Sequence, residues 1–266
     1  MNYLKLTVLM SFIFLVGCSN EPAEEELETN KVFSEYMTCT PGVDFTDESA
    51  RIMVDEWNNM EFPEGFFSWG HLPKESVTLG GENKYYWQLF WNTQEDADKA
   101  WAEGPSEEFA AWAEKYQSVL TCDEENRRKY DNHWPRDLDA SGEWDEDAAQ
   151  WVSYAHYCKF NGDDGKEKLD AAIMAFNAYL DEAETGDDGP FTFGIYYHSG
   201  ENPEPYSDYD FFWINYYQNH ADAKTSYARF DDNGGEIQAM FDEAAICEEN
   251  AVRMDTFQFY PDPDDA

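Results

Sequence analysis

The chain has 266 residues, of which 42% are hydrophobic and 17% aromatic, a composition that supplies apolar mass for a core and excludes a largely disordered chain. Its formal net charge is −40, from 57 acidic and 17 basic side chains. Self-repulsion on this scale keeps a protein soluble and disfavours binding to nucleic acid or to an anionic lipid surface. We interpret the acidic excess as a solvated surface of the kind expected in a saline habitat. The alternative is recruitment of divalent cations or cationic partners.

The first twenty residues have the pattern of a secretory signal. Lys5 is their only charged side chain, an apolar run extends to Val16, and the small residue Gly17 ends it. The run is shorter than the roughly 20 apolar residues that span a bilayer. We therefore predict a signal peptide over residues 1–17.

The residues Leu15-Val16-Gly17-Cys18 resemble the lipobox of bacterial lipoproteins. The resemblance implies cleavage before Cys18, lipidation of that cysteine and a chain anchored to a membrane through its N-terminus. Ser19 follows, which implies sorting to the outer membrane, on its periplasmic or surface face. Residues 18–34, rich in Glu, are then expected to form an acidic tether. An ordinary signal peptide with an incidental cysteine is the alternative.

Between residues 35 and 134 the apolar spacing alternates between strand-like and helix-like segments. Strands are predicted over residues 36–40, 66–71, 85–91 and 127–134, helices after the capping residues Thr46 and Ser106, and a helical turn over 96–101. The resulting order is βαββαβ, which is that of a ferredoxin-like unit.

Residues 153–261 repeat this order after a polar linker at 135–152, and residues 262–266 form a tail. The predicted strands cover residues 153–160, 191–198, 209–217 and 253–260, with one helix face from Leu169 to Ala183 and a second helix capped by Asn233. A ferredoxin-like sheet carries its helices on one face, and a second copy can cover the other face. We therefore predict an α+β fold in which two ferredoxin-like repeats pack as an intrachain pseudo-dimeric barrel.

Four cysteines remain once Cys18 is assigned to the lipid. Four cysteines allow three pairings, but each repeat holds one near its start and one near its end. Because an exported protein sits where disulfides persist, we predict Cys39–Cys122 and Cys158–Cys247.

Phe90-Trp91-Asn92 is followed by an acidic, alanine-bearing helix start at 96–101, and Trp213-Ile214-Asn215 is followed by Ala221-Asp222-Ala223. In these residues and in topology over about residues 35–261, the chain resembles the dimeric α+β barrel superfamily, which includes antibiotic-biosynthesis-type monooxygenases. The resemblance implies a cavity between the sheets for flat aromatic molecules. In members that oxygenate without a cofactor, Asn, Trp, His or Tyr side chains bind an enolate or phenolate.

The repeat places two histidines at the ends of corresponding strands, each with an aromatic residue two positions earlier on the same face. The candidate pocket residues are His71, His198, Trp69, Tyr196, Trp91, Asn92, Trp213 and Asn215. Histidine can act as base, acid or ligand near neutral pH. Strand-end histidines bonded to turns, and aromatic side chains that simply fill the core, are the alternatives.

No metal site and no cofactor are predicted. The segment 161–165 lacks the alternating donors of a calcium loop, and no predicted helix carries a histidine well placed for haem. Three functions remain: a lipid-anchored, non-enzymatic module that binds a small apolar or aromatic ligand or a partner, a cofactor-independent monooxygenase-like enzyme, and a structural envelope lipoprotein. We favour the non-enzymatic module, because few titratable residues fall in the expected barrel.

Overall fold

The computed structural model describes residues 30–74, 84–137, 140–145, 150–182, 189–249 and 251–258. The predicted signal peptide, Cys18 and the tail at 262–266 lie outside these ranges. Within them, no helix has the length and apolarity that crossing a bilayer requires.

The first half of the chain forms β1 (Asn30–Pro41), α1 (Asp47–Trp57), β2 (Phe67–Pro73), β3 (Tyr85–Trp91), α2 (Gln94–Glu103), α3 (Glu107–Tyr116), β4 (Leu120–Cys122) and β5 (Arg128–Trp134). The second half forms β6 (Gln150–Phe160), α4 (Gly165–Glu182), β7 (Phe191–His198), the 3-10 turn η2 (Tyr206–Asp208), β8 (Phe211–Tyr217), α5 (His220–Asn233), α6 (Gly235–Ala244), β9 (Ala245–Cys247) and β10 (Val252–Gln258).

Eight antiparallel strands close into a barrel. The pairing order is β10-β2-β3-β1-β5-β7-β8-β6, and β6 pairs with β10 to complete the ring. The two halves meet twice, where β5 pairs with β7 and where β10 pairs with β2. Because the ring has no free edge, every one of these strands has two neighbours.

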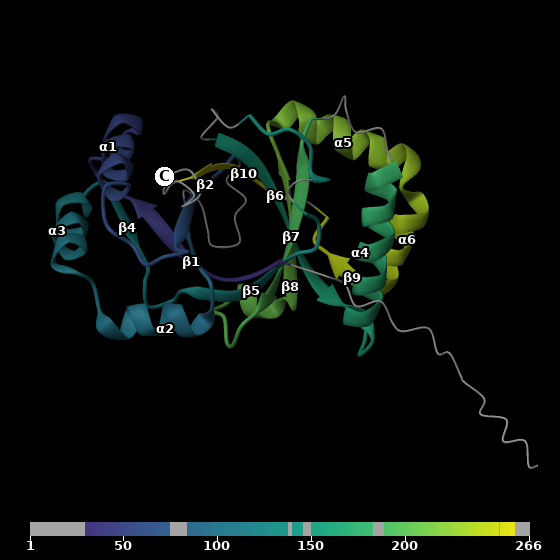
Figure 1. Ribbon diagram of the computed structural model, residues 1–266, viewed down its shortest axis with the longest axis horizontal. Helices are drawn as coiled ribbons and strands as arrows, with labels where there is room; N and C mark the ends of the chain where they lie inside the picture. Colours follow the sequence, from purple (N-terminus) through teal and green to yellow (C-terminus); the bar gives the residue numbers. More distant parts are fainter. Residues whose placement is uncertain are drawn as a thin grey trace, which may run out of the picture.

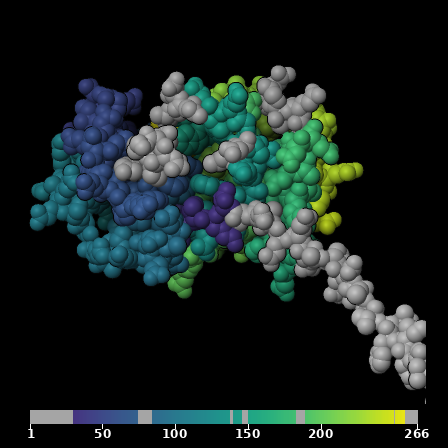
Figure 2. Space-filling model, in the orientation of Figure 1, coloured from purple at the N-terminus to yellow at the C-terminus, as the bar shows by residue number. Residues whose placement is uncertain are grey.

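Helices cover the barrel from outside on two opposite sides. Helices α1, α2 and α3 lie on one side and α4, α5 and α6 on the other, with the strands between them (Figure 1). In the space-filling view, the purple-to-teal first half and the green-to-yellow second half form the two sides of the molecule (Figure 2). Side chains alternate across each strand, so one set points into the barrel lumen and the other packs under the helices.

Three hydrophobic clusters follow from this alternation. One lies under the first-half helices around Trp57 and Trp87, and one lies under the second-half helices around Phe176 and Trp213. The third lies in the lumen and is rich in tyrosine. The lumen is therefore a packed layer of its own between the two helix layers.

The predicted helix starts at Thr46 and Ser106 are confirmed. Both residues are extended, and their hydroxyls accept hydrogen bonds from the backbone N–H groups of Ser49 and Phe109. The prediction that Asn233 caps a helix is wrong, because Asn233 is the last residue of α5. The side chain that caps α5 is Asn219, which accepts from two backbone N–H groups.

Each half is more elaborate than βαββαβ. The predicted helical turn after β3 is a complete helix, α2, and α5 stands at the corresponding place in the second half. Strand β1 begins at Asn30, inside the predicted tether, because Phe33 is buried and residues 30–36 pair with β5. Strand β6 likewise begins at Gln150, inside the predicted linker, and pairs there with β10.

The short strands β4 and β9 were not predicted, yet they explain the disulfides. β4 sets Cys122 opposite Cys39 on β1, and β9 sets Cys247 opposite Cys158 on β6. Both predicted disulfides, Cys39–Cys122 and Cys158–Cys247, are present.

Candidate functional site

A belt of hydrogen bonds crosses the lumen side of six successive barrel strands. His71 on β2 is fully buried and bonds through Nε2 to Gln88 Oε1 at 2.9 Å and through Nδ1 to Thr256 Oγ1 at 3.0 Å. The belt runs, in order, through Asn132, Ser34, Gln88, His71, Thr256 and Ser153. Because Gln88 Oε1 can only accept, the belt assigns the proton of His71 to Nε2.

Burial decides the charge of this histidine. Desolvation lowers the pKa of His71 to about 4, against a smaller raising effect of the Gln88 hydrogen bond. His71 is therefore neutral at neutral pH and acts as a fixed donor and acceptor in the belt.

Tyrosines fill much of the lumen on either side of the belt. Tyr196 stacks on Phe212 with ring centroids 4.5 Å apart, and its hydroxyl lies 2.6 Å from the hydroxyl of Tyr216. Burial raises the pKa of both tyrosines, so both hydroxyls stay protonated.

A cavity of about 380 Å³ lies outside the barrel, between the outer face of the second-half strands and helices α4, α5 and α6. Its walls are largely aromatic, including Phe176, Trp213, Phe230 and Phe241. Exposed acidic side chains, Asp231, Asp242, Glu248 and Glu249, line its rim. The volume lies in the range of small-molecule sites.

A connected polar relay forms one wall of this cavity. Trp213 Nε1–H donates to Asn215 Oδ1 at 2.7 Å, and Asn215 Nδ2–H donates to the Tyr227 hydroxyl at 2.9 Å. The Tyr227 hydroxyl lies 3.0 Å from His156 Nε2. All four side chains line the cavity.

The proton positions in the relay follow from its chemistry. Burial raises the pKa of Tyr227 to about 12 although the Asn215 hydrogen bond lowers it, so the hydroxyl is protonated. Burial lowers the pKa of His156, and a hydrogen bond with the backbone at Glu248 opposes this. Because a backbone carbonyl can only accept, we assign the His156 proton to Nδ1, which leaves Nε2 to accept from Tyr227.

The same positions in the first half carry no such relay. Strand register pairs Cys39 with Tyr85 and Cys158 with Phe211, so positions in the two halves can be counted from the disulfides. By this count, His156 is at the position equivalent to Met37, Asn215 to Leu89 and Tyr227 to Trp101. Met37 and Leu89 are buried in a closed core.

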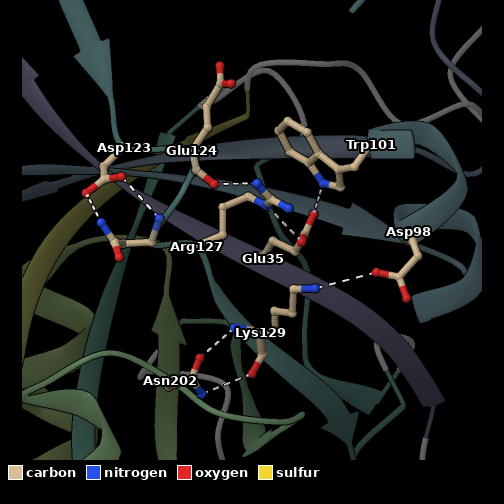
Figure 3. Close-up of polar contacts among 9 residues, drawn as sticks. Glu35, Asp98, Trp101, Asp123, Glu124, Arg127, Lys129 and Asn202 are labelled. Carbon is tan, nitrogen blue, oxygen red and sulfur yellow. Dashed lines mark hydrogen bonds and ion pairs between the residues drawn. The ribbon is translucent and has the colours of Figure 1, made fainter. Parts of the chain in front are cut away.

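Trp101, at the position of Tyr227, has a different role. Its indole Nε1–H donates to Glu35 at 2.5 Å, and Arg127 Nε donates to the other oxygen of Glu35 at 3.1 Å (Figure 3). Arg127 also lies over the Trp101 ring, 3.8 Å from its centroid. In the first half, the buried carboxylate of Glu35 joins α2 to the sheet. In the second half, the corresponding helix, α5, carries the Tyr227 hydroxyl, which faces the cavity.

The predicted pocket residues fall into separate places. Trp69, His71 and Tyr196 lie in the lumen, and His198 lies half-buried at the end of β7 against the ring of Tyr130. Trp213 and Asn215 line the outer cavity. Trp91 packs against Phe66 under the first-half helices, and Asn92 is exposed. The prediction of one shared cavity between the sheets is therefore wrong, because strand alternation sends neighbouring aromatic residues to opposite faces.

The two pairings proposed between the repeats are also wrong. Counted from the disulfides, Asn215 corresponds to Leu89 and not to Asn92. His71 pairs with Tyr86 and Tyr196 pairs with Phe212, so His71 corresponds to Tyr196 and not to His198.

Two relay residues, His156 and Tyr227, were not among the predicted site residues. His156 lies directly opposite Trp213 in the pairing of β6 with β8. The signal for it was the two-residue spacing from Cys158, which places both side chains on one face of the strand. Tyr227 could be found by counting two helical turns from the cap at Asn219.

Two histidines near the second-half helices already have hydrogen-bond partners on their ring nitrogens and are not free to bind a haem iron. His220 begins α5, but its Nδ1 lies 2.9 Å from the Tyr154 hydroxyl and its Nε2 lies 3.1 Å from Asp255. Nε2 of His156 is taken by Tyr227. Within the described ranges, no three His, Cys, Asp or Glu side chains converge as metal ligands do.

Comparisons with known proteins support the fold. No protein-family model matches the sequence, and no curated protein is significantly similar to it. Among solved structures, the chain is similar to a candidate monooxygenase from Lactobacillus acidophilus NCFM, with 11% identity over 87% of this chain and 95% of that chain and a TM-score of 0.51. It is also similar to a candidate monooxygenase from Fusobacterium nucleatum, with 8% identity over 86% and 93% of the two chains and a TM-score of 0.50.

These structures are dimeric α+β barrels, and the chain has that fold, with a closed barrel and flanking helices. Both are named for enzymes, which contradicts the prediction of a non-enzymatic binding module.

Proposed function

We propose that the chain is an enzyme that oxygenates flat aromatic substrates without a cofactor, in the cavity under α4, α5 and α6. The observation that carries the proposal is the relay of Trp213, Asn215, Tyr227 and His156 in the wall of an aromatic cavity. The first half, at the same positions, is closed and largely apolar.

The relay has the groups that a substrate with an ionisable C–H or O–H needs. Tyr227 can take a substrate proton on its oxygen while its own proton passes to His156 Nε2, 3.0 Å away. Asn215 donates a hydrogen bond to the same oxygen and so stabilises negative charge there. A neutral His156 can accept that proton at neutral pH.

The chemistry balances with dioxygen as the only oxidant. Loss of a proton from an activated methylene group leaves a carbanion, which transfers one electron to dioxygen. Recombination of the two radicals forms a C–O bond, and return of the proton from His156 through Tyr227 gives a hydroperoxide on that carbon. The hydroperoxide then loses water, so that the methylene group and one molecule of dioxygen become a carbonyl group and one molecule of water.

The acidic rim selects among such substrates. Four exposed carboxylates at the mouth outnumber the one lining arginine, Arg229, and disfavour entry of an anion, so we expect the substrate to enter neutral and to lose its proton inside. Aromatic walls favour a planar, fused-ring substrate.

An oxygen electrode tests the proposal. We expect the full chain to consume dioxygen with at least one member of a panel of fused-ring aromatic ketones that carry a benzylic methylene group. Asn215→Leu, which installs the first-half residue, should lower the rate about 100-fold. Asn92→Leu, at an exposed site, is the matched control and should not. Equal rates in both variants, or no uptake with any panel member, would contradict the proposal.

We also propose that the barrel is an intrachain pseudo-dimer of two ferredoxin-like repeats over about 35–134 and 153–261, held outside the cytoplasm by lipid on Cys18. Support for the repeats comes from the shared strand order β2-β3-β1-β5 and β7-β8-β6-β10 and from the equivalent disulfides. The disulfides also favour export. Labelled palmitate should be incorporated into the full chain and not into Cys18→Ser, and its incorporation into both would contradict a lipid on Cys18.

A further inference from the structure

Arg128 is a positive charge buried in the barrel lumen. It is 2% exposed, at the start of β5, and opposite Tyr36 in the strand pairing. No ion pair to Arg128 exists among the described residues, and its Nε and Nη2 atoms have no hydrogen-bond partner there. An unpaired buried charge costs several kcal/mol, so its place in the lumen needs an explanation.

Tyrosine rings surround the guanidinium. Its Cζ atom lies 3.9 Å from the ring centroid of Tyr206, 4.8 Å from that of Tyr86 and 5.1 Å from that of Tyr36. Cation–π contacts of this kind contribute, but they leave the N–H groups of Nε and Nη2 without acceptors among the described residues.

No tyrosinate supplies the missing negative charge. Burial raises the pKa of Tyr130 to about 12 and raises those of Tyr36 and Tyr157, although Arg128 lowers all three. These hydroxyls are protonated at neutral pH and offer further donors around the guanidinium.

The donors extend along the same face of β5. Asn132, two positions beyond Tyr130, is fully buried, its Oδ1 accepts from Ser34, and its Nδ2 has no hydrogen-bond partner among the described residues. The lumen thus combines a cation with unused N–H donors in a chain whose net charge is −40.

The other half of the barrel lacks this feature. Arg128 lies opposite Tyr36 on β1, and the corresponding pair on β6 and β10 is Ala155 with Val252. The fold therefore accepts an apolar residue at this position, and barrel closure does not require an arginine.

We propose that Arg128 is a binding site for a small monovalent anion inside the barrel, of the size of chloride, bromide or formate, with the hydroxyls of Tyr36 and Tyr130 completing the donors. The site is separate from the outer cavity, since it lies on the other face of the sheet.

Thermal unfolding of the full chain provides one test. Sodium formate and sodium bromide should raise Tm saturably, by about 5 °C above sodium gluconate at the same ionic strength. Arg128→Met should abolish the difference between the salts, whereas Arg51→Met, at an exposed arginine, should keep it. Equal Tm values in the three salts for the wild-type chain would overturn the proposal.

Crystals of the wild-type chain soaked in bromide provide a second test that needs no variant. We expect an anomalous peak within hydrogen-bonding distance of the Arg128 guanidinium. If Arg128→Met does not fold, Tyr36→Phe takes its place in the unfolding test. This variant removes one hydroxyl and leaves the ring, and it should weaken the formate effect several-fold. Bromide peaks confined to the protein surface would overturn the proposal.

Discussion

The Tyr227 hydroxyl lies 3.0 Å from His156 Nε2, joining a helix residue to a strand residue across the wall of an aromatic cavity. The hydroxyl also accepts from Asn215. Before substrate binds, Tyr227 is protonated and His156 is neutral, so the pair carries no net charge. Transfer of the proton from Tyr227 to His156 leaves that net charge unchanged.

Tyr227→Phe removes the hydroxyl and keeps the ring. We expect kcat for dioxygen uptake to fall about 100-fold, with KM nearly unchanged, because proton transfer contributes on that scale and the aromatic surface remains. Steady-state kinetics in an oxygen electrode measures both values. A rise in KM alone would assign Tyr227 to substrate binding only.

His156→Met installs the residue of the first half at this position, Met37. The loss of the base should match the loss seen in Tyr227→Phe, and the double variant should be no slower than either single one, because the two groups act as one relay. Additive losses would show that the two side chains act independently.

The pH dependence of the reaction follows from His156. Burial lowers its pKa, so the neutral base persists below the ordinary histidine range near pH 6.5. We expect kcat to be constant from about pH 6.5 to about pH 8 and to fall only at lower pH, in a profile that His156→Met lacks. An acid limb centred above about pH 6.5 would contradict the neutral, buried state.

His71 should make folding stability depend on pH. Its pKa in the folded chain is about 4, below the value of about 6.5 in the unfolded chain. Between these values the unfolded chain binds more protons, so the free energy of unfolding falls as the pH falls, by about 3 kcal/mol in total. Urea unfolding at pH 7, 5.5 and 4 measures it. His71→Gln should show a slope smaller by one proton, and an unchanged slope would contradict this prediction.

The fold class was predictable from the sequence, because apolar alternation and helical spacing are local. Thr46 and Ser106 were identified as caps for the same reason. The disulfides were predictable from the position of one cysteine near each end of each half, although the short strands that carry Cys122 and Cys247 have only three residues each and no pattern of their own.

The site was predicted only in part, through Trp213 and Asn215. Aromatic runs such as Phe90-Trp91 and Phe212-Trp213 look alike whichever face each ring takes, so aligning these runs placed the two halves of the chain out of register. Counting from Cys39 and Cys158 corrects the register and identifies His156. The lumen belt was beyond prediction, because its six residues come from six strands whose order in the barrel is set by long-range pairing.

The buried carboxylate of Glu35 should stabilise the first half. Glu35→Gln weakens its bonds to Arg127 and Trp101, and we expect a loss of about 2–3 kcal/mol in the free energy of unfolding. Asp98→Asn, in the exposed pair with Lys129, should cost less than about 0.5 kcal/mol. Figure 3 shows both sets of contacts. Urea denaturation compares the two variants, and equal losses would contradict the difference in burial.

Isotope labelling with 18O-labelled dioxygen tests the central claim most directly. With a substrate found by dioxygen uptake, the proposed reaction places one labelled oxygen atom in the product carbonyl and the other in water, and Asn215→Leu forms little labelled product. An unlabelled carbonyl oxygen that comes from solvent water, or equal labelling by the Asn215→Leu variant, would contradict oxygenation in the cavity of Trp213, Asn215, Tyr227 and His156.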